Sequence, residues 1–385
     1  MKKDAILSVD ELKVRFYTYE GIVKAIEGVN LFVRKGETLG VAGETGCGKS
    51  VTGLSILNLV PSPGKIEDGK IIFSKDGKQI DLLQQDEQYL CALRGKDISM
   101  VFQEPRAALN PVYTVERQIG EVLILHRKEE IVGRVIKQLR KDLEKENNPI
   151  KRFIYKTELG LYKKMMKNSR SLYLKAASKI PIIRRYEHRL WKEIRKEVIK
   201  ILKEMEIADP ERVVDAYPHE LSGGMAQRVV IAMALACNPV LLIADEPTTS
   251  LDVTVQAQVL DLIRRLKEKF GSSIIYVTHD LGVIAELCER VAIMYAGSIC
   301  EVADVYELFK NPLHPYTRGL LEAIPHPDKP FKSIKGFVPN LIDPPSGCRF
   351  HPRCPYAMDI CKQIKPKIRE IKKDHFVACH LFGES

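Results

Sequence analysis

The octapeptide Gly43-Glu-Thr-Gly-Cys-Gly-Lys-Ser50 matches the phosphate-binding loop pattern G-x-x-x-x-G-K-[ST] at every fixed position. The apolar run before it, Thr38–Ala42, predicts a buried strand, and the run after it, Val51–Leu57, predicts a helix. A strand, a glycine-rich turn and a helix N-terminus aim backbone N–H groups and the positive end of a helix dipole at one anion. The loop therefore predicts an α/β fold organised around a phosphate site.

The bulk composition limits the kinds of protein that this chain can be. Its 385 residues leave room for two or three domains, and 45% hydrophobic residues suffice for a buried core. The longest apolar run, Val229–Cys237, is far shorter than the roughly 18–20 residues of a membrane span. The N-terminus lacks the apolar core of a signal peptide. We therefore expect a cytosolic protein, or one attached to a membrane from the cytosolic side, without structural disulfides between its nine cysteines.

The net charge of +10 is concentrated in one segment of the chain. Residues 127–203 contain 24 Lys and Arg against 9 Asp and Glu, so this segment carries +15 and the rest of the chain −5. Any anionic partner that recognises the protein through charge is therefore expected to bind this segment.

Periodicity divides the chain into strand-rich and helical parts. Residues 6–42 alternate as an antiparallel β region does, and residues 66–83 predict a hairpin. From residue 114 to about 203 the pattern is helical, and residues 253–270 have helical spacing followed by a glycine. Three short apolar runs are continuous, as in parallel strands covered on both faces: Ile98–Phe102, Val240–Ala244 and Ser273–Thr278.

Two carboxylates end the buried run Leu241-Leu-Ile-Ala-Asp-Glu246. Carboxylates at such a place are costly unless they hold a cation or water. We expect Asp245 to hold hydrated Mg²⁺ and Glu246 to act as the general base on an attacking water. Lys49 would supply a point charge to the β- and γ-phosphates, and Ser50 a hydroxyl to Mg²⁺. These roles predict hydrolysis of a nucleoside triphosphate.

Two polar side chains follow other buried strands. Gln103, in Val101-Phe-Gln-Glu-Pro105, would orient water or Mg²⁺ from the opposite side, although a lone Gln here is more often a surface residue. His279, in Val277-Thr-His-Asp280, would hydrogen-bond the γ-phosphate, although a lone His is more often structural. Their places at strand ends favour the catalytic interpretation for both.

A second candidate anion site lies at Ser222-Gly223-Gly224, which opens a helix expected to end near Cys237. The alternative is that Ser222 is only the N-cap of this helix. The two glycines after it favour close approach of a ligand instead.

After the phosphate loop come, in order, Gln103, Leu221–Met225, Leu241–Glu246, Ser250–Asp252 and His279. With these motifs the chain resembles the ATP-binding subunit of an ABC transporter over about residues 6–310. The resemblance implies a P-loop NTPase core with an antiparallel β subdomain and a helical subdomain at about 104–235, in a domain of residues 1–310. It also implies that ATP is sandwiched between two subunits. Ser222, Gly223, Gly224 and Asp252 would then complete the site of the opposing subunit.

The resemblance also implies which residues contact the nucleotide. An upstream aromatic ring would stack on adenine: Phe16 is our first choice, with Tyr17 and Tyr19 as alternatives, unless Phe16 is only a half-buried strand residue. Gln103 and Asp245 would join Ser50 around Mg²⁺. Contacts with ATP are expected from Gly43, Glu44, Thr45, Gly46, Cys47, Gly48, Lys49, Ser50 and Val51.

The tail, residues 311–385, is a separate region with more Pro, Cys and Lys. Residues 311–325 and 347–355 resemble the region that follows the ATPase core in oligopeptide and dipeptide importers. Some members of that subfamily carry a [4Fe–4S] cluster here, which four cysteinates suit. The spacing is not the C-x-x-C of zinc ribbons, so the cluster, zinc, and free or packing cysteines all stay open. The four cysteines are Cys348, Cys354, Cys361 and Cys379.

The chain departs from ordinary members of the family by a basic insertion at about 132–195. One interpretation is a solvated helical hairpin. The other is contact with anionic lipid headgroups or an acidic partner beside transmembrane subunits. No nucleic-acid recognition motif is present, so we expect no nucleic-acid partner. The aromatic residues of the insertion are Tyr155, Tyr162, Tyr173, Tyr186 and Trp191.

Together these patterns predict an ATPase subunit that drives peptide import at the cytoplasmic face of the cell membrane. It would pair with a homologous ATPase, expected to be a paralogue, with two transmembrane permeases and with an extracytoplasmic peptide-binding protein. The alternatives are a soluble ABC ATPase that acts on ribosomes or DNA, an importer ATPase for another solute such as nickel, and a metal-regulated interaction module with a vestigial ATPase.

Overall fold

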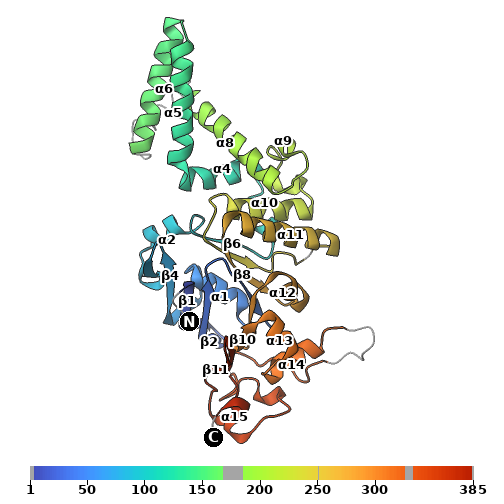
Figure 1. The fold of residues 1–385 in the computed structure, drawn as a ribbon. Coiled ribbons are helices and arrows are strands. Elements are labelled where there is room, and N and C mark those ends of the chain that lie inside the picture. The colour runs from blue at the N-terminus through green and yellow to red at the C-terminus, as the bar shows by residue number, and fades with distance from the viewer. Residues whose placement is uncertain (1–3, 168–184, 250, 326–332, 384–385) are drawn as a thin grey trace. The chain divides into compact units, whose positions relative to one another are not determined.

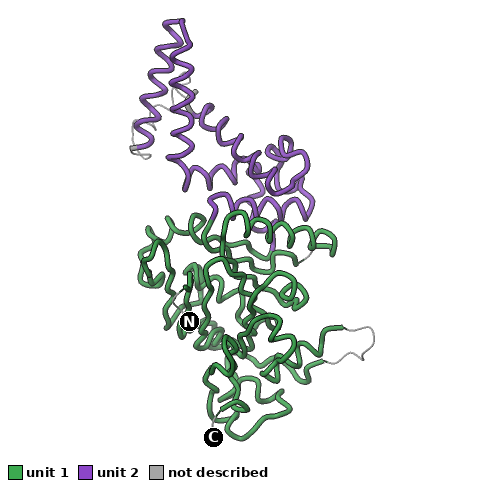
Figure 2. Tube along the Cα trace, in the orientation of Figure 1, with its two compact units in different colours: residues 1–103, 239–385 green, residues 104–238 purple. Residues whose placement is uncertain are grey.

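The computed structural model describes residues 4–167, 185–249, 251–325 and 333–383. The chain divides into two compact units (Figure 2). Residues 1–103 and 239–385 form the first unit, and residues 104–238 form the second. The chain thus enters the second unit just after Gln103, which follows the strand Ile98–Val101. It returns to the first unit just before the strand Leu241–Asp245.

A mixed eight-stranded sheet forms the centre of the first unit, in the order β11-β12-β10-β9-β3-β8-β7-β6 (Figure 1). The strands from β9 to β6 are parallel and buried along their whole length, as their continuous apolar runs predict. The remaining three pair antiparallel. The strands are β3 (Thr38–Ala42), β6 (Ile98–Val101), β7 (Leu241–Asp245), β8 (Ser273–Thr278), β9 (Arg290–Tyr295), β10 (Ser298–Asp304), β11 (Arg369–Lys372) and β12 (His375–Val377).

A second, antiparallel sheet has the order β2-β1-β4-β5. Its strands alternate between buried and exposed residues, so one face covers a core. Side chains of both sheets share that core, among them Val14 and Phe73 from this sheet and Val41 and Ile243 from the larger one. The predicted hairpin is confirmed as β4 and β5, and the antiparallel region as β1 and β2, whereas Thr38–Ala42 forms the parallel strand β3 of the larger sheet. The strands are β1 (Ala5–Thr18), β2 (Gly21–Arg34), β4 (Gly64–Lys75) and β5 (Lys78–Asp81).

Helices of the first unit cover the larger sheet and extend into the tail. The helix α1 contacts β7 and β8, and α12 contacts β3 and β8. The predicted helix at 253–270 is confirmed as α11, and Gly271, at φ 65°, ends it in the left-handed conformation. The helices are α1 (Lys49–Ile56), α2 (Glu87–Leu93), α11 (Val253–Phe270), α12 (Leu281–Leu287), α13 (Val305–Lys310), α14 (Pro315–Glu322) and α15 (Asp359–Gln363).

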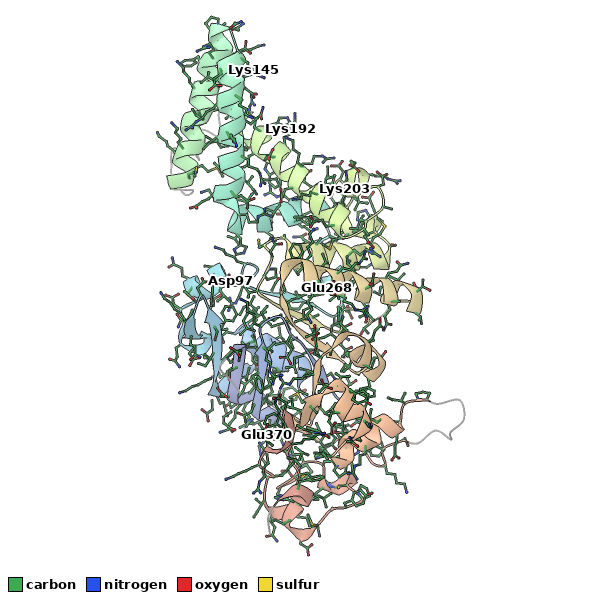
Figure 3. All side chains as sticks on the ribbon, viewed as in Figure 1. Asp97, Lys145, Lys192, Lys203, Glu268 and Glu370 are labelled. Atoms are coloured by element: carbon green, nitrogen blue, oxygen red, sulfur yellow. The ribbon has the colours of Figure 1, made fainter. Side chains whose placement is uncertain are left out.

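The second unit is helical, as predicted. Its helices α5 and α6 pair as a hairpin joined by residues 146–148, and α8 packs against both α4 and α5 (Figure 1). Side chains such as Lys145 project outward from the hairpin (Figure 3). The helices are α3 (Pro105–Ala108), α4 (Val115–His126), α5 (Lys128–Lys145), α6 (Pro149–Lys167), α8 (Arg185–Glu204), α9 (Pro210–Val213) and α10 (Gly223–Leu235).

The aromatic residues of the insertion serve internal packing where the structure describes them. Tyr162 is fully buried. Trp191 packs over Gly120, so closely that a Cβ on this glycine would lie 2.7 Å from the indole ring. The Arg189 guanidinium lies over the Tyr155 ring at 4.8 Å from its centroid. Tyr173 and the side chain of Tyr186 lie outside the described residues.

The tail joins the larger sheet instead of standing apart from it. In β12, Val377 and Phe376 pair with Glu301 and Val302 of β10, and β11 then pairs with β12. The sequence boundary near residue 311 therefore does not separate two sheets. Across the described parts of the chain, no helix combines the length and apolarity that crossing a membrane requires.

Candidate nucleotide-binding site

The phosphate loop is the turn between β3 and α1, as the sequence predicts. Gly48 is the N-cap of α1 with φ 100°, a left-handed conformation that side chains disfavour. At Gly43 the backbone of β9 approaches so closely that a Cβ would lie 2.0 Å from the carbonyl oxygen of Met294. Both glycines are therefore required by the shape of the loop, whatever ligand it binds.

Lys49 is almost entirely buried within this loop, with 5% of its surface exposed. Its Nζ donates hydrogen bonds to the carbonyl oxygens of Gly43 at 2.8 Å and of Glu44 at 3.1 Å. Carbonyl groups at the start of the loop thus hold the Lys49 ammonium group inside the loop. A cation so placed can meet an anion that also accepts hydrogen bonds from the loop N–H groups.

The end of β7 meets the start of α1 through one hydrogen bond. Ser50 Oγ donates to Asp245 Oδ1 at 3.0 Å. Burial raises the pKa of Asp245, the Ser50 hydrogen bond opposes this rise, and the charge of Glu246 adds to it. A hydroxyl and a carboxylate in contact at this point form a ligand pair of the kind that Mg²⁺ prefers.

The carboxylate of Glu246 contacts two other predicted residues, Gln103 and His279, each of which follows a neighbouring strand. Gln103 Nε2 donates to its Oε2 at 3.2 Å, and His279 Nδ1 lies 3.2 Å from its Oε1. The backbone of Glu246 has a φ of 45° and donates its N–H to Val277 O at 2.9 Å. Positive φ is uncommon for a residue with a side chain, and such conformations concentrate at functional sites.

Sequence reasoning missed one residue of this group. Thr249 Oγ1 donates to Glu246 Oε2 at 3.0 Å, so it shares this oxygen with Gln103. The available signal was a polar residue three positions after the carboxylate, just beyond Pro247, which ends the strand pattern. The carboxylate is therefore held on both oxygens, which fixes its orientation.

The remaining predicted nucleotide residues occupy capping and strand positions. Ser222 Oγ accepts the N–H of Met225 at 3.3 Å as the N-cap of α10, in the second unit, and Gly223 and Gly224 form the first turn of this helix. Asp252 Oδ1 likewise accepts the N–H of Val255 at 2.9 Å as the N-cap of α11. Ser250, in the same predicted motif, lies outside the described residues.

Three aromatic residues near the end of β1 differ in their surroundings. Phe16 is partly buried and packs against the core between the two sheets. Tyr17 donates its hydroxyl to Glu67, and Tyr19 is 99% exposed. The stacking of Phe16 on adenine stays a prediction.

The four tail cysteines lie close together, but they do not form a metal-binding group. The N–H of Cys348 donates to the carbonyl oxygen of Cys361 at 2.8 Å. Burial, with added effects of Cys361, Cys379 and Cys354, raises the pKa of Cys348 to about 11. All nine cysteines of the chain are free thiols. Within the described ranges no group of three or more His, Cys, Asp or Glu side chains could hold a metal ion, so the structure does not support the predicted [4Fe–4S] cluster or the zinc alternative.

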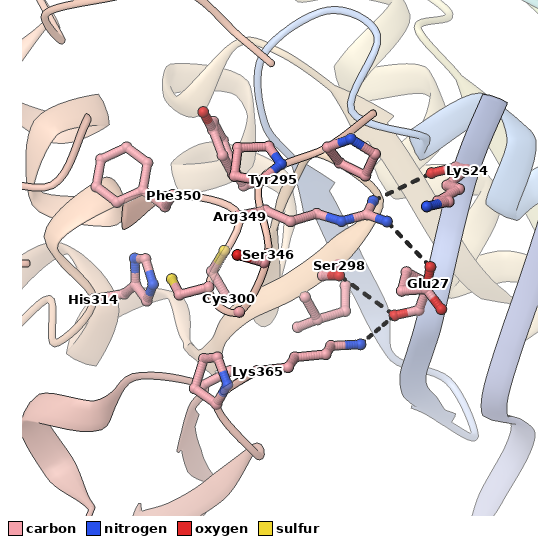
Figure 4. A pocket seen from close by; sticks show the side chains of 17 residues that line it. Lys24, Glu27, Tyr295, Ser298, Cys300, His314, Ser346, Arg349, Phe350 and Lys365 are labelled. Carbon is pink, nitrogen blue, oxygen red and sulfur yellow. Dashed lines mark hydrogen bonds and ion pairs between the residues drawn. The ribbon is translucent and has the colours of Figure 1, made fainter. Parts of the chain in front are cut away.

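A cavity of about 240 Å³ lies where the tail meets β2, β9 and β10 (Figure 4). Arg349 lines this cavity, and its guanidinium donates to Glu27 Oε2 at 3.1 Å and to the carbonyl oxygen of Ala296. The next residue, Gly297, donates its N–H to Cys47 O of the phosphate loop at 2.8 Å. The turn between β9 and β10 thus connects the tail with one side of the loop.

The other side of the loop contacts the tail directly. The N–H of Glu44 donates to the Tyr316 hydroxyl at 3.0 Å, and the Glu44 carboxylate forms a two-pronged ion pair with Arg353. No sequence pattern relates positions so far apart, so these contacts could not be foreseen.

With this geometry in place, comparison with known proteins gives the family. The ABC transporter family matches residues 26–249, and the chain belongs to this family of ATPases. Residues 300–361 match the family described as the oligopeptide/dipeptide transporter C-terminal region. The family therefore covers the phosphate loop, Gln103 and Glu246, and the second match covers Tyr316 and Arg353.

Relatives match the chain over almost its whole length. A probable peptide ABC transporter ATP-binding protein of Sinorhizobium fredii is 42% identical over 98% of this chain and 95% of its own. The oligopeptide transport ATP-binding protein AppD of Bacillus subtilis is 41% identical over 98% and 97%. The dipeptide transport ATP-binding protein DppD of the same species is 40% identical over 98% and 95%.

Two solved structures share the fold. A dimeric ATP-binding cassette with bound ADP and phosphate has a TM-score of 0.52 and 24% identity, covering 78% of this chain and 98% of its own. The protein cbiO1 from Clostridium perfringens, part of the ABC transporter complex cbiONQ, has a TM-score of 0.53 and 24% identity, covering 80% and 92%. At this identity the likeness confirms the predicted fold alone.

Proposed function

We propose that this chain is the ATP-hydrolysing subunit of an importer for oligopeptides or dipeptides. The observation that carries the proposal is the similarity to peptide-transport ATP-binding proteins over 98% of the chain, through the tail as well as the ATPase core. A soluble ABC ATPase acting on ribosomes or DNA would not be expected to share a transporter-type tail. The intact site around Glu246 argues against a vestigial ATPase.

In this proposal the loop binds the triphosphate of ATP. The N–H groups of residues 43–51 and the Lys49 ammonium neutralise the phosphate charge, and Phe16 stacks on the adenine. Ser50, Asp245 and Gln103 would hold Mg²⁺, which when bound neutralises charge that develops on the phosphates. The Ser50–Asp245 contact supports this assignment because both oxygens already lie side by side.

Glu246 is proposed as the general base. A base must be oriented toward the water whose proton it accepts, and Gln103, Thr249 and His279 fix this carboxylate from both sides. His279, with its side chain 55% exposed, keeps a surface from which it can also reach the γ-phosphate. Hydrolysis would thus follow from positioning and charge rather than from a covalent intermediate.

The proposed assembly contains a second ATPase, expected to be a paralogue. Ser222, Gly223, Gly224 and Asp252 would contact the nucleotide bound to that partner, so that closure of the pair follows ATP binding. The N-terminus of α10 is a suitable anion site because the helix has 13 residues and presents free N–H groups at its start. Two permeases and an extracytoplasmic peptide-binding protein would complete the importer, with this subunit peripheral on the cytoplasmic face of the membrane.

The decisive experiment is transport by the purified assembly. The affinity-tagged chain is expected to co-purify with two permeases and a second ATPase, and proteoliposomes with the binding protein should take up a labelled dipeptide or oligopeptide when ATP is supplied. A matched assembly with Lys49→Ala should not. Uptake of Ni²⁺ instead of peptide would assign another solute, and recovery with ribosomes instead of permeases would overturn the transport proposal.

For the tail, we retain the [4Fe–4S] cluster as a proposal to be tested. Its support is that four free thiols lie close together in one region, although they form no metal-binding group in the structure. Anaerobically purified protein would show absorption near about 400 nm and four iron and four sulfide per chain if the cluster forms. Protein without iron would leave these residues as packing cysteines.

The basic insertion is proposed to contact anionic lipid headgroups. Within residues 137–164 the exposed acidic side chain is that of Glu144. At the start of α6, Ile150 and Phe153 are apolar yet 71% and 72% exposed, as residues that enter a lipid interface are. The exposed cations in this range are Lys137, Arg140, Lys141, Lys145, Lys151, Lys156, Lys163 and Lys164.

Sedimentation with vesicles tests this contact. Binding to phosphatidylserine vesicles should weaken with salt and with Ile150→Ser/Phe153→Ser, and it should be absent with phosphatidylcholine alone. Val112→Ser, which changes a residue of the second unit that is equally exposed at 72%, serves as the control. Equal binding to both vesicle types would exclude a role for charge.

A further inference from the structure

Arg353 is a buried cation whose partner lies in the phosphate loop. Its guanidinium Nη1 donates to Glu44 Oε2 at 2.7 Å and its Nη2 to Oε1 at 3.1 Å. The Arg353 side chain is 5% exposed and that of Glu44 is 28% exposed. This two-pronged geometry is the most specific arrangement that an arginine and a carboxylate can adopt.

Contacts with residues other than Glu44 also fix the position of the Arg353 guanidinium. Its Nε donates to Lys335 O at 3.1 Å and its Nη2 to Ile334 O at 3.4 Å, and Nη1 lies 3.4 Å from the Tyr295 hydroxyl. The donors of the side chain are therefore committed to fixed acceptors. Arg353 forms a rigid support and not a mobile surface charge.

Tyr316 holds the backbone of the same loop residue. Its hydroxyl accepts the N–H of Glu44 at 3.0 Å, and its ring is fully buried against Tyr295 and Phe350, at centroid distances of 4.6 and 5.3 Å. The tail therefore binds Glu44 at two places: Arg353 contacts the Glu44 carboxylate, and Tyr316 contacts the Glu44 backbone N–H.

These contacts at Glu44 also affect the position of Lys49. The carbonyl oxygens of Gly43 and Glu44 both accept hydrogen bonds from the Lys49 ammonium. A change in the Glu44 peptide therefore moves the acceptors that orient Lys49. A buried ion pair alone is weak evidence for a role in stability, because its desolvation offsets much of its attraction. A role in fixing the geometry of the loop explains why such a pair is placed here.

We propose that Arg353, together with Tyr316, is a positioning residue for ATP binding: the tail fixes Glu44 and thereby sets the place of the Lys49 ammonium. This inference rests on the proposed role of the loop as the ATP site. It gives the C-terminal region, which the family match leaves without a role at the nucleotide, a direct part in its binding. Arg353 would act on affinity, and Glu246 would still act on the chemical step.

Steady-state kinetics of the full-length chain, or of its assembly, test the inference. Arg353→Met keeps the aliphatic stem but removes both hydrogen bonds, and it should raise KM and Kd for MgATP about tenfold with a smaller change in kcat. Glu44→Gln should raise them similarly. Because both act through one contact, the double variant should be no worse than the weaker-binding single variant. Arg353→Lys, which restores the charge without the fork, should recover part of the affinity.

Two controls separate failure of this inference from failure of the proposed function. Lys362→Met removes an exposed ion pair with Asp359 in the same tail, at 3.0 Å, and should leave KM unchanged. Lys49→Ala should abolish MgATP binding, and if it does not, the assignment of the ATP site itself is wrong. If Lys49→Ala behaves as expected but Arg353→Met and Glu44→Gln keep the wild-type KM, or their effects add, the positioning role is refuted. Glu44→Gln lies outside the tail, so an unchanged KM in this variant refutes the positioning role even if Arg353→Met misfolds.

Discussion

Nδ1 of His279 lies 3.2 Å from Oε1 of Glu246, a contact that joins the ends of the neighbouring parallel strands β8 and β7. Gln103, which follows β6 at the edge of the sheet, holds the other oxygen of the same carboxylate. Residues at the ends of three adjacent strands thus fix the orientation of one candidate base, Glu246. Parallel strands bring their carboxyl ends to one edge, which is why residues far apart in sequence meet here.

Glu246→Gln is expected to stop hydrolysis without preventing ATP binding. The amide keeps the size of the side chain but cannot accept a proton, and removal of a general base lowers turnover by about 10²- to 10⁴-fold. Single-turnover hydrolysis and equilibrium binding of MgATP measure the two quantities. Turnover near the wild-type rate would reject Glu246 as the base.

Asp245→Asn is expected to raise the Mg²⁺ concentration needed for half-maximal ATPase activity by about tenfold or more, because a neutral amide is a poorer ligand for a hard cation. Ser50→Ala should act in the same direction. Titration of Mg²⁺ at fixed ATP measures the change. Ser55→Ala is the control. It removes a hydroxyl of the same helix, which donates to Val51 O at 2.6 Å, and it should leave the Mg²⁺ dependence unchanged.

Gly120→Ala is expected to destabilise the second unit by about 1–3 kcal/mol, because its Cβ would meet the Trp191 ring at 2.7 Å and overpack the contact of α4 with α8. Trp191 is the single tryptophan of the chain, so its fluorescence reports on this unit during urea unfolding. Gly133→Ala is the matched control, since nothing lies within 4 Å of its Cβ and alanine favours a helix. Equal stability of both variants would contradict the packing described for Trp191.

Acid is expected to destabilise the fold around His314. Burial lowers the pKa of His314 to about 4, from an ordinary value of 6.5. The unfolded chain therefore takes up a proton below about pH 6.5 that the folded chain refuses until about pH 4, so stability falls across this window, by about 3 kcal/mol in all. His314→Asn, which preserves an N-cap for α14, should reduce the slope of unfolding free energy against pH there. Parallel curves for the two proteins would count against this assignment.

The parts of the fold that sequence could predict are those with local causes. Continuous apolar runs gave the parallel strands, and the glycine pattern gave the loop before α1, because each depends on neighbours in the chain. The grouping of Gln103, Glu246 and His279 followed from their common position after such strands.

Contacts that depend on tertiary packing escaped prediction. Arg353 and Glu44, which form an ion pair, are 309 positions apart in the sequence, and no periodic pattern of residue types predicts that they meet. The basic composition of the insertion left a solvated hairpin and a surface for anionic partners as interpretations, but it gave no sign that Tyr162 is buried or that Trp191 packs against Gly120. Thiol spacing alone could not reveal that Cys348 and its neighbours lie near one another without forming a metal-binding group.

The order in which the chain is synthesised gives the contact between Arg353 and Glu44 a further consequence. Arg353 follows Glu44 by 309 positions, so the nascent polypeptide cannot form this contact with its phosphate loop until the tail has been synthesised. Premature termination before β12 would also leave β10 with an uncovered edge, open to pairing with other chains. A product cut short there is therefore expected to lack the contact with Glu44 and to aggregate through the open edge of β10.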